Sequence, residues 1–137
     1  MTSTATAQVK LNKQTVPIIG MLSAQLLLGM AENLIGKPDD VKNTEKVLSG
    51  TILALHILIG LVLIVRGTIA LRLTMEQGGN TLRLARAGFA GIFIAFVAGV
   101  LTMAITTGDS WWSYIMTIGF LIAFLAYGTL ATRQFKA

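Results

Sequence analysis

Long runs of apolar residues alternate with short polar stretches along this chain, and four of the runs are long enough to cross a bilayer. They cover about residues 14–36, 47–72, 84–107 and 111–132. A helix needs about 20 mostly apolar residues to cross the hydrocarbon core, and the runs lack the period-two alternation of barrel strands. The pattern predicts an all-α fold, an integral membrane four-helix bundle, with residues 1–137 forming one domain.

The composition agrees with this prediction. Hydrophobic residues make up 54% of the 137 residues and charged residues 12%, and a soluble domain of this size would leave much of that apolar surface in water. The chain has no cysteine, which excludes disulfides, thiolate metal sites and cysteine nucleophiles. Its net charge of +5 comes from basic residues that flank the apolar runs, so it indicates membrane topology rather than nucleic-acid binding.

The basic residues predict how the chain lies in the membrane. With four spans, both termini and the middle loop share one side. That side carries Lys10, Lys13, Arg66, Arg72, Arg83, Arg86, Arg133 and Lys136. The first and third loops carry three lysines, which four acidic residues offset. The positive-inside rule therefore predicts an N-in/C-in protein of the cytoplasmic membrane. Arg66 lies inside the second run, where its long side chain can snorkel to the interface.

Small residues predict that the last two helices pack closely. These residues are Ala87, Gly91, Ala95 and Gly99, at a strict spacing of four in the third run, and Gly119 and Ala123 in the fourth. Between the second and third runs, Gly78 and Gly79 predict a turn. Trp111, Trp112 and Tyr114 begin the fourth run, where aromatic residues typically anchor a helix at the interface.

Polar residues gather in the first two runs. One face of the first helix carries Gln25, Gly29 and Glu32, and one face of the second carries His56, Gly60 and Gly67. Counted from the outer helix ends at about 1.5 Å per residue, Gln25 lies roughly 16 Å deep and His56 roughly 13 Å. We therefore expect these two side chains to meet in the outer half of the membrane.

His56 is the only histidine, and two interpretations of it stay open. In the first, a hydrogen bond between His56 and Gln25 fixes the register of the two helices, contributing about 0.6–2 kcal/mol. In the second, His56 is an axial ligand of haem iron, because imidazole is a common metal ligand and ionisable residues inside membranes often mark function. Gly60, one turn away, would then leave room for the porphyrin, with Gln25 and Gly29 also in the site.

The segment QLLLG and the later segment LHILIGLVLI are together similar to one helix pair of the haem A synthase family. This resemblance covers about residues 23–66 and implies that His56 belongs to a haem site. The family relies on several histidines in two four-helix halves, whereas this chain has one, so the synthase reaction is not implied. A single haem b would take Met30 or Met116 on its other side, or a second His56 across a homodimer. The chain also resembles short, uncharacterised four-span bacterial membrane proteins, which implies a fold but no activity.

Transport and enzyme chemistry have less support. A small multidrug transporter needs a carboxylate deep in the membrane, whereas Glu32 lies about 6 Å from its helix end. One histidine, six acidic residues and no cysteine assemble neither a Ser-His-Asp set nor a cluster of metal ligands. We therefore expect a non-enzymatic partner or accessory subunit, in a homodimer or a larger membrane complex. Haem binding for electron transfer or haem carriage is the alternative, followed by a small transporter or channel.

Overall fold

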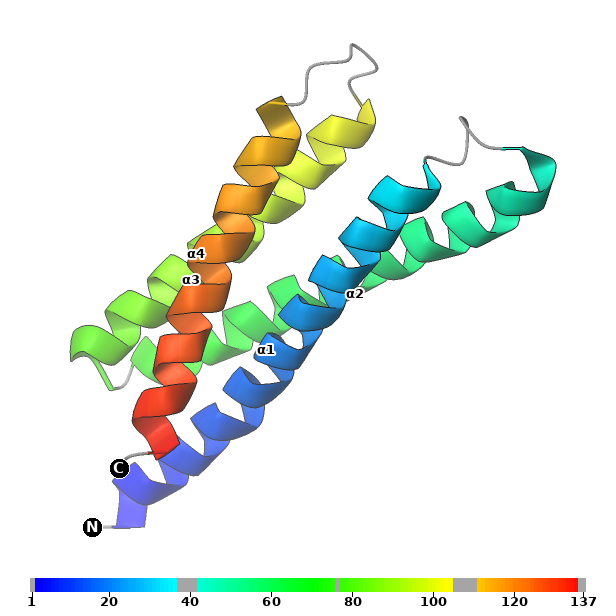
Figure 1. Ribbon diagram of the computed structural model, residues 1–137. Helices are drawn as coiled ribbons and strands as arrows, with labels where there is room; N and C mark the ends of the chain where they lie inside the picture. The colour runs from blue at the N-terminus through cyan, green and yellow to red at the C-terminus, as the bar shows by residue number, and fades with distance from the viewer. Residues whose placement is uncertain (1, 37–41, 76, 105–110, 136–137) are drawn as a thin grey trace.

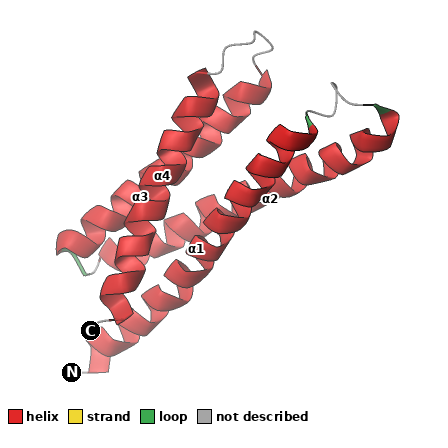
Figure 2. Cartoon of the chain, in the orientation of Figure 1, coloured by secondary structure: helices red, strands yellow, loops and turns green. Residues whose placement is uncertain are grey.

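The structure, a computed structural model, describes residues 2–36, 42–75, 77–104 and 111–135. These residues form four helices, and Figure 2 shows only short loops beside them. The helices are α1 (Thr2–Ile35), α2 (Asn43–Met75), α3 (Gly79–Ala104) and α4 (Trp111–Phe135). All four are long and apolar enough to cross a membrane, which confirms the all-α prediction and agrees with a membrane bundle.

The helices extend beyond the apolar runs that predict them. α1 begins at Thr2, so the polar segment before residue 14 is helical rather than a tail, and α2 continues to Met75. Hydropathy marks the part of a helix suited to lipid, whereas main-chain hydrogen bonds can continue the helix into its polar flanks. α3 is described to Ala104, and the predicted residues 105–107 lie outside the described residues.

The helices form a ring in which each packs against two others. α1 contacts α2 and α4, and α3 contacts α2 and α4. Both termini lie at the same end of the bundle as the turn between α2 and α3 (Figure 1), and we call this the terminal end. From there, the hairpin of α1 and α2 diverges from the hairpin of α3 and α4 towards the opposite end (Figure 1).

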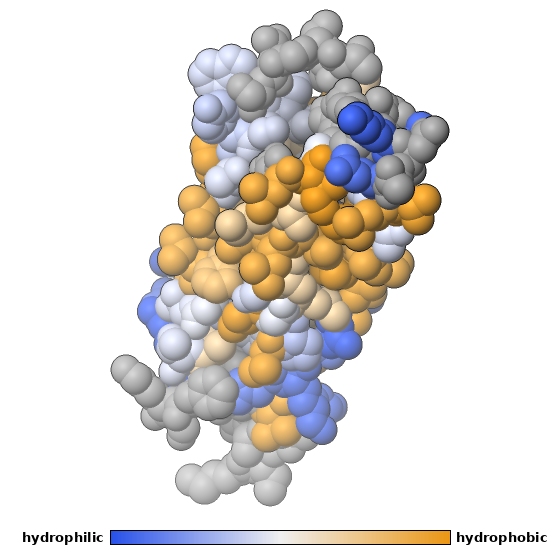
Figure 3. All heavy atoms as spheres, turned by 45° about the vertical axis from the view of Figure 1, so that its right-hand side comes forward, coloured by the Kyte–Doolittle hydropathy of each residue, from blue (hydrophilic) through white to orange (hydrophobic). Residues whose placement is uncertain are grey.

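The buried core lies towards the terminal end. Its members are Leu11, Ile18 and Leu22 of α1, Leu63 and Ala70 of α2, Ala85 and Ile92 of α3, and Ala123, Tyr127 and Leu130 of α4. On the outward sides of the helices, large apolar side chains such as Leu27 and Leu125 are exposed. Figure 3 shows a hydrophobic band across the middle of one face, with hydrophilic residues above and below it. Such a surface is suited to lipid or to another membrane helix.

α3 and α4 meet through their backbones. A Cβ atom added at Gly91 would lie 2.5 Å from the carbonyl oxygen of Gly119 and 2.7 Å from the nitrogen of Ala123. A Cβ atom at Gly119 would in turn lie 2.8 Å from the nitrogen of Ala95. Glycine is required at both positions because any side chain would separate the helices. We call this contact the glycine seam.

The glycine seam includes Gly91 and Ala95 of the predicted row of small residues, but Ala87 is exposed. Gly88 is buried instead, beneath the ring of Tyr127. The reason is helical geometry: each step of four residues turns by about 40° more than one full circle. A strict row of four therefore leaves the contact, whereas alternating steps of three and four stay on it.

The helix ends use glycines where the backbone turns sharply. Gly36 follows α1 with φ 94°, and Gly78 and Gly79 have φ 65° and 58°, which confirms the predicted turn between α2 and α3. Trp111 and Tyr114 are both exposed at the start of α4, as interface anchors would be. Residues 37–41 and 105–110, between α1 and α2 and between α3 and α4, lie outside the described residues.

Candidate functional site: the polar contact between α1 and α2

Three hydrogen bonds of side chains connect α1 to α2, and we call them the polar ladder. Its rungs run from the Ser49 hydroxyl to the Gly36 carbonyl oxygen (2.6 Å), from Gln25 Nε2 to the His56 carbonyl oxygen (2.9 Å), and from Arg66 Nη1 to Gln14 Oε1 (3.2 Å). Within the described ranges, every side-chain hydrogen bond between different helices belongs to this pair. The two hairpins are therefore held by different contacts, polar in one and small-residue packing in the other.

Two residues of the ladder share one stripe of α1. Gln14 and Gln25 are eleven residues apart, and eleven residues make about three turns of 3.6 residues. Gly36 lies just beyond the end of α1 and contributes only its main-chain carbonyl oxygen. The rungs at Ser49 and Arg66 were not predicted from the sequence, although the eleven-residue spacing of Gln14 and Gln25 is visible in it. The closeness of Gln25 and His56 was predicted because both are conspicuous polar residues in an apolar setting.

The middle rung brings together the four predicted site residues. His56 Cε1 lies 3.5 Å from the position of a Cβ atom on Gly29, and Gln25 Nε2 lies 3.4 Å from that of a Cβ atom on Gly60. Each glycine is four residues beyond the polar residue of its own helix. Each polar side chain therefore fits over the glycine of the other helix, and the two helices interlock.

The hydrogen bond itself differs from the expected one. Gln25 donates to the main-chain oxygen of His56 and not to its imidazole. Two buried polar atoms at this contact, His56 Nδ1 and Gln25 Oε1, have no hydrogen-bond partner. An unpaired buried polar atom costs free energy comparable to a lost hydrogen bond. His56 Nδ1 and Gln25 Oε1 could therefore each still form a hydrogen bond with another group.

Haem at His56 would need open space beside the ring. The position above Gly60 is instead covered by Gln25 and by Phe96 of α3, whose Cδ2 lies 3.6 Å from an added Cβ atom. The position above Gly29 is covered by His56 itself. These contacts form a packed interface rather than a cradle for a porphyrin.

The other residues considered as metal ligands lie elsewhere. Met30 is 55% exposed on α1, and the Met116 sulfur packs 3.5 Å from the Cβ position of Gly99, between α3 and α4. Glu32 is half-buried near the end of α1. Among the described residues, no group of three or more His, Cys, Asp or Glu could hold a metal ion.

Comparisons with protein-family models, with curated proteins and with solved structures gave no match to this chain. The resemblance of residues 23–66 to the haem A synthase family therefore stays a prediction.

Proposed function

We propose that this protein is a non-enzymatic accessory subunit of the cytoplasmic membrane, with both termini in the cytoplasm. The interlock of Gln25 and His56 over Gly60 and Gly29 is the observation that carries the proposal. It uses the most conspicuous polar residues of the membrane segments to join two helices, a role that such residues often have in membrane proteins. A hairpin joined in this way suits a structural partner.

The charge distribution supports the proposed orientation. At the terminal end, the exposed basic residues are Lys10, Lys13, Arg72, Arg83, Arg86 and Arg133. At the opposite end, the described charged residues include Lys42, Lys46 and Glu45, all exposed. Because basic residues accumulate on the cytoplasmic side, the terminal end faces the cytoplasm.

A partner would contact one side of the bundle. Each helix offers a large exposed apolar side chain at mid-membrane level, and the four chosen are Leu27, Leu58, Phe93 and Leu125. In a chain surrounded only by lipid, the side chains at all four positions contact lipid and none contacts another protein. In an accessory subunit, one or two neighbouring positions contact another protein through close helix packing.

Site-specific photo-crosslinking tests this proposal. A photoreactive amino acid is placed at each of the four positions in turn, in cells that make the protein at its natural level. We expect a discrete adduct with one other protein from one side of the bundle and none from the opposite side. Adducts between two copies of the chain would indicate a homodimer instead. No protein adduct from any position would contradict the proposal.

Haem b binding, for electron transfer or haem carriage, is the second candidate, and the unpartnered Nδ1 of His56 favours it. It requires Gln25 and Phe96 to move away from Gly60. The test is an absorption spectrum of the purified protein, oxidised and dithionite-reduced, after expression with added haem. A Soret band lost in His56→Ala but kept in Gln14→Ala, which removes a different rung, would replace the packing role with a haem site.

A further inference from the structure

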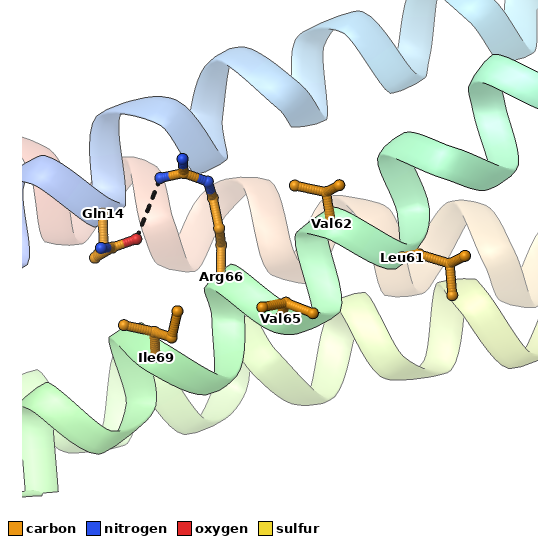
Figure 4. A pocket seen from close by; sticks show the side chains of 6 residues that line it. All are labelled: Gln14, Leu61, Val62, Val65, Arg66 and Ile69. Carbon is orange, nitrogen blue, oxygen red and sulfur yellow. Dashed lines mark hydrogen bonds between the residues drawn. The ribbon is translucent and has the colours of Figure 1, made fainter.

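The rung between Gln14 and Arg66 borders a pocket of about 380 Å³. Its lining residues are Gln14 of α1 and Leu61, Val62, Val65, Arg66 and Ile69 of α2. Figure 4 shows the Arg66 side chain extending from α2 towards Gln14 on α1, with the apolar side chains along α2. Leu61, Val65 and Ile69 are all exposed, so the pocket opens to the surroundings of the bundle.

Arg66 brings a positive charge that nothing nearby on the described chain balances. A guanidinium has five N–H donors, and the hydrogen bond of Arg66 is to the neutral amide oxygen of Gln14. Among residues with described side chains, the acidic ones are Glu32 and Glu45. Glu45 lies 21 residues away on the same helix, about 31 Å, and Glu32 lies 18 residues beyond Gln14, about 27 Å.

The position of Arg66 along α2 matches the depth of a lipid headgroup. The apolar span Glu45–Met75 has 31 residues, about 46 Å of helix, against a hydrocarbon core of about 30 Å. If the excess is shared equally between the two ends, the boundary lies about 8 Å from Met75. Arg66, nine residues before Met75, then lies about 5 Å inside that boundary, within reach of a snorkelling side chain.

The apolar part of the pocket continues away from this charge. Leu61, Val62 and Val65 precede Arg66 and form an apolar row along α2, about 6 Å long, whereas Ile69 follows Arg66 on the side of the terminal end. Lys10, which is exposed, precedes Gln14 by one turn on the same face of α1. The groove therefore combines the positive charge of Arg66 with an apolar row towards the middle of the membrane, and Lys10 adds a second positive charge on the side of the terminal end.

We propose that this groove binds one anionic phospholipid. Its phosphate accepts hydrogen bonds from the free donors of Arg66, and one acyl chain lies along Val65, Val62 and Leu61, towards the middle of the membrane. Anionic lipid is favoured over zwitterionic lipid because the described residues offer no carboxylate near the groove to pair with a headgroup ammonium. This site does not depend on the accessory role proposed above.

Native mass spectrometry of the purified full-length protein tests the site. Phosphatidylglycerol or phosphatidylcholine with the same acyl chains is added, and the retained lipid is counted. We expect one retained phosphatidylglycerol, with about tenfold less retention in Arg66→Gln, because a hydrogen bond to a charged group is lost. Arg72→Gln is the matched control, since it removes the same charge from an exposed position of the same helix.

A second variant separates lipid binding from folding. Val65 is 60% exposed, so Val65→Trp fills the groove while leaving the bundle core and Arg66 in place. We expect it to lower phosphatidylglycerol retention as Arg66→Gln does. Equal retention of the two lipids, or equal losses in Arg66→Gln and Arg72→Gln, would overturn the proposal. So would complete displacement of the lipid by millimolar inorganic phosphate, which would indicate a small-anion site.

Discussion

A methyl group at Gly91 would force α3 and α4 apart. In Gly91→Ala, the new Cβ atom would start 2.5 Å from the Gly119 carbonyl oxygen and 2.7 Å from the Ala123 nitrogen, whereas ordinary contacts of a Cβ atom begin at 3.4 Å. The helices must therefore separate locally by about 0.9 Å, the difference between 3.4 and 2.5 Å. Both obstacles are main-chain atoms, so no change of side-chain rotamer can relieve the clash.

The expected cost follows from that displacement. A gap of 0.5–1 Å removes about a quarter to a half of the dispersion attraction between the atoms it separates, and overpacking of a tight site costs about 1–3 kcal/mol. We place Gly91→Ala at the upper end, about 3 kcal/mol, because it disturbs the whole glycine seam. Gly128→Ala in α4 is the control, since nothing lies within 4 Å of its Cβ position. There alanine should stabilise the helix by up to about 1 kcal/mol.

Unfolding of the purified protein by sodium dodecyl sulfate in mixed micelles measures both variants, with helix content followed by circular dichroism. We expect the free energies of unfolding of Gly91→Ala and Gly128→Ala to differ by about 3–4 kcal/mol. If the two variants were equally stable, the backbone contact between α3 and α4 would not exist as described.

The same titration tests three further changes. Gln25→Ala should lower the free energy of unfolding by about 0.6–1.7 kcal/mol, because it removes one rung; a loss above about 3 kcal/mol would mean that the rung does more than join helices. Tyr127→Phe should be neutral or stabilising by about 1 kcal/mol, because the Tyr127 hydroxyl is buried without a partner; clear destabilisation would reveal a hidden partner. Gly78→Ala should cost about 1–2 kcal/mol, because its φ of 65° is unfavourable for alanine; an unchanged stability would contradict the turn geometry.

The sequence predicted the helices well because apolar length is a direct consequence of bilayer thickness. It predicted their ends less well, since the main-chain hydrogen bonds of α1 continue through Lys13 and Lys10 regardless of hydropathy. The closeness of Gln25 and His56 followed from their similar depths and from the polar face that each shares with glycines of its own helix. Which atom accepts the hydrogen bond did not, because that depends on the rotation of each helix about its axis, and hydropathy does not determine this rotation.

The pocket at Arg66 could not be predicted from the sequence, because it also depends on the rotation of each helix about its axis. Snorkelling accounts for the depth of Arg66 but not for its direction, which is towards Gln14 on the neighbouring helix. The eleven-residue spacing of Gln14 and Gln25 could have indicated a shared stripe. The change from Ala87 to Gly88 follows from the rotation of about 40° per step of four residues, but which of the small residues of α3 face α4 depends on the rotation of α3 about its axis.

The polar ladder also bears on how the chain is inserted during synthesis. If α1 entered the bilayer alone, Gln25 would meet hydrocarbon without a partner, and if α2 entered alone, Arg66 would have to reach the interface without its hydrogen bond to Gln14. When α1 and α2 enter together, Gln25 can donate its hydrogen bond to α2 and Arg66 can donate to α1, so neither side chain lacks a partner. The described part of α3 and α4 carries no such interhelical bond. We therefore expect α1 and α2 to leave the translocon as one hairpin, and α3 and α4 to be able to follow one at a time.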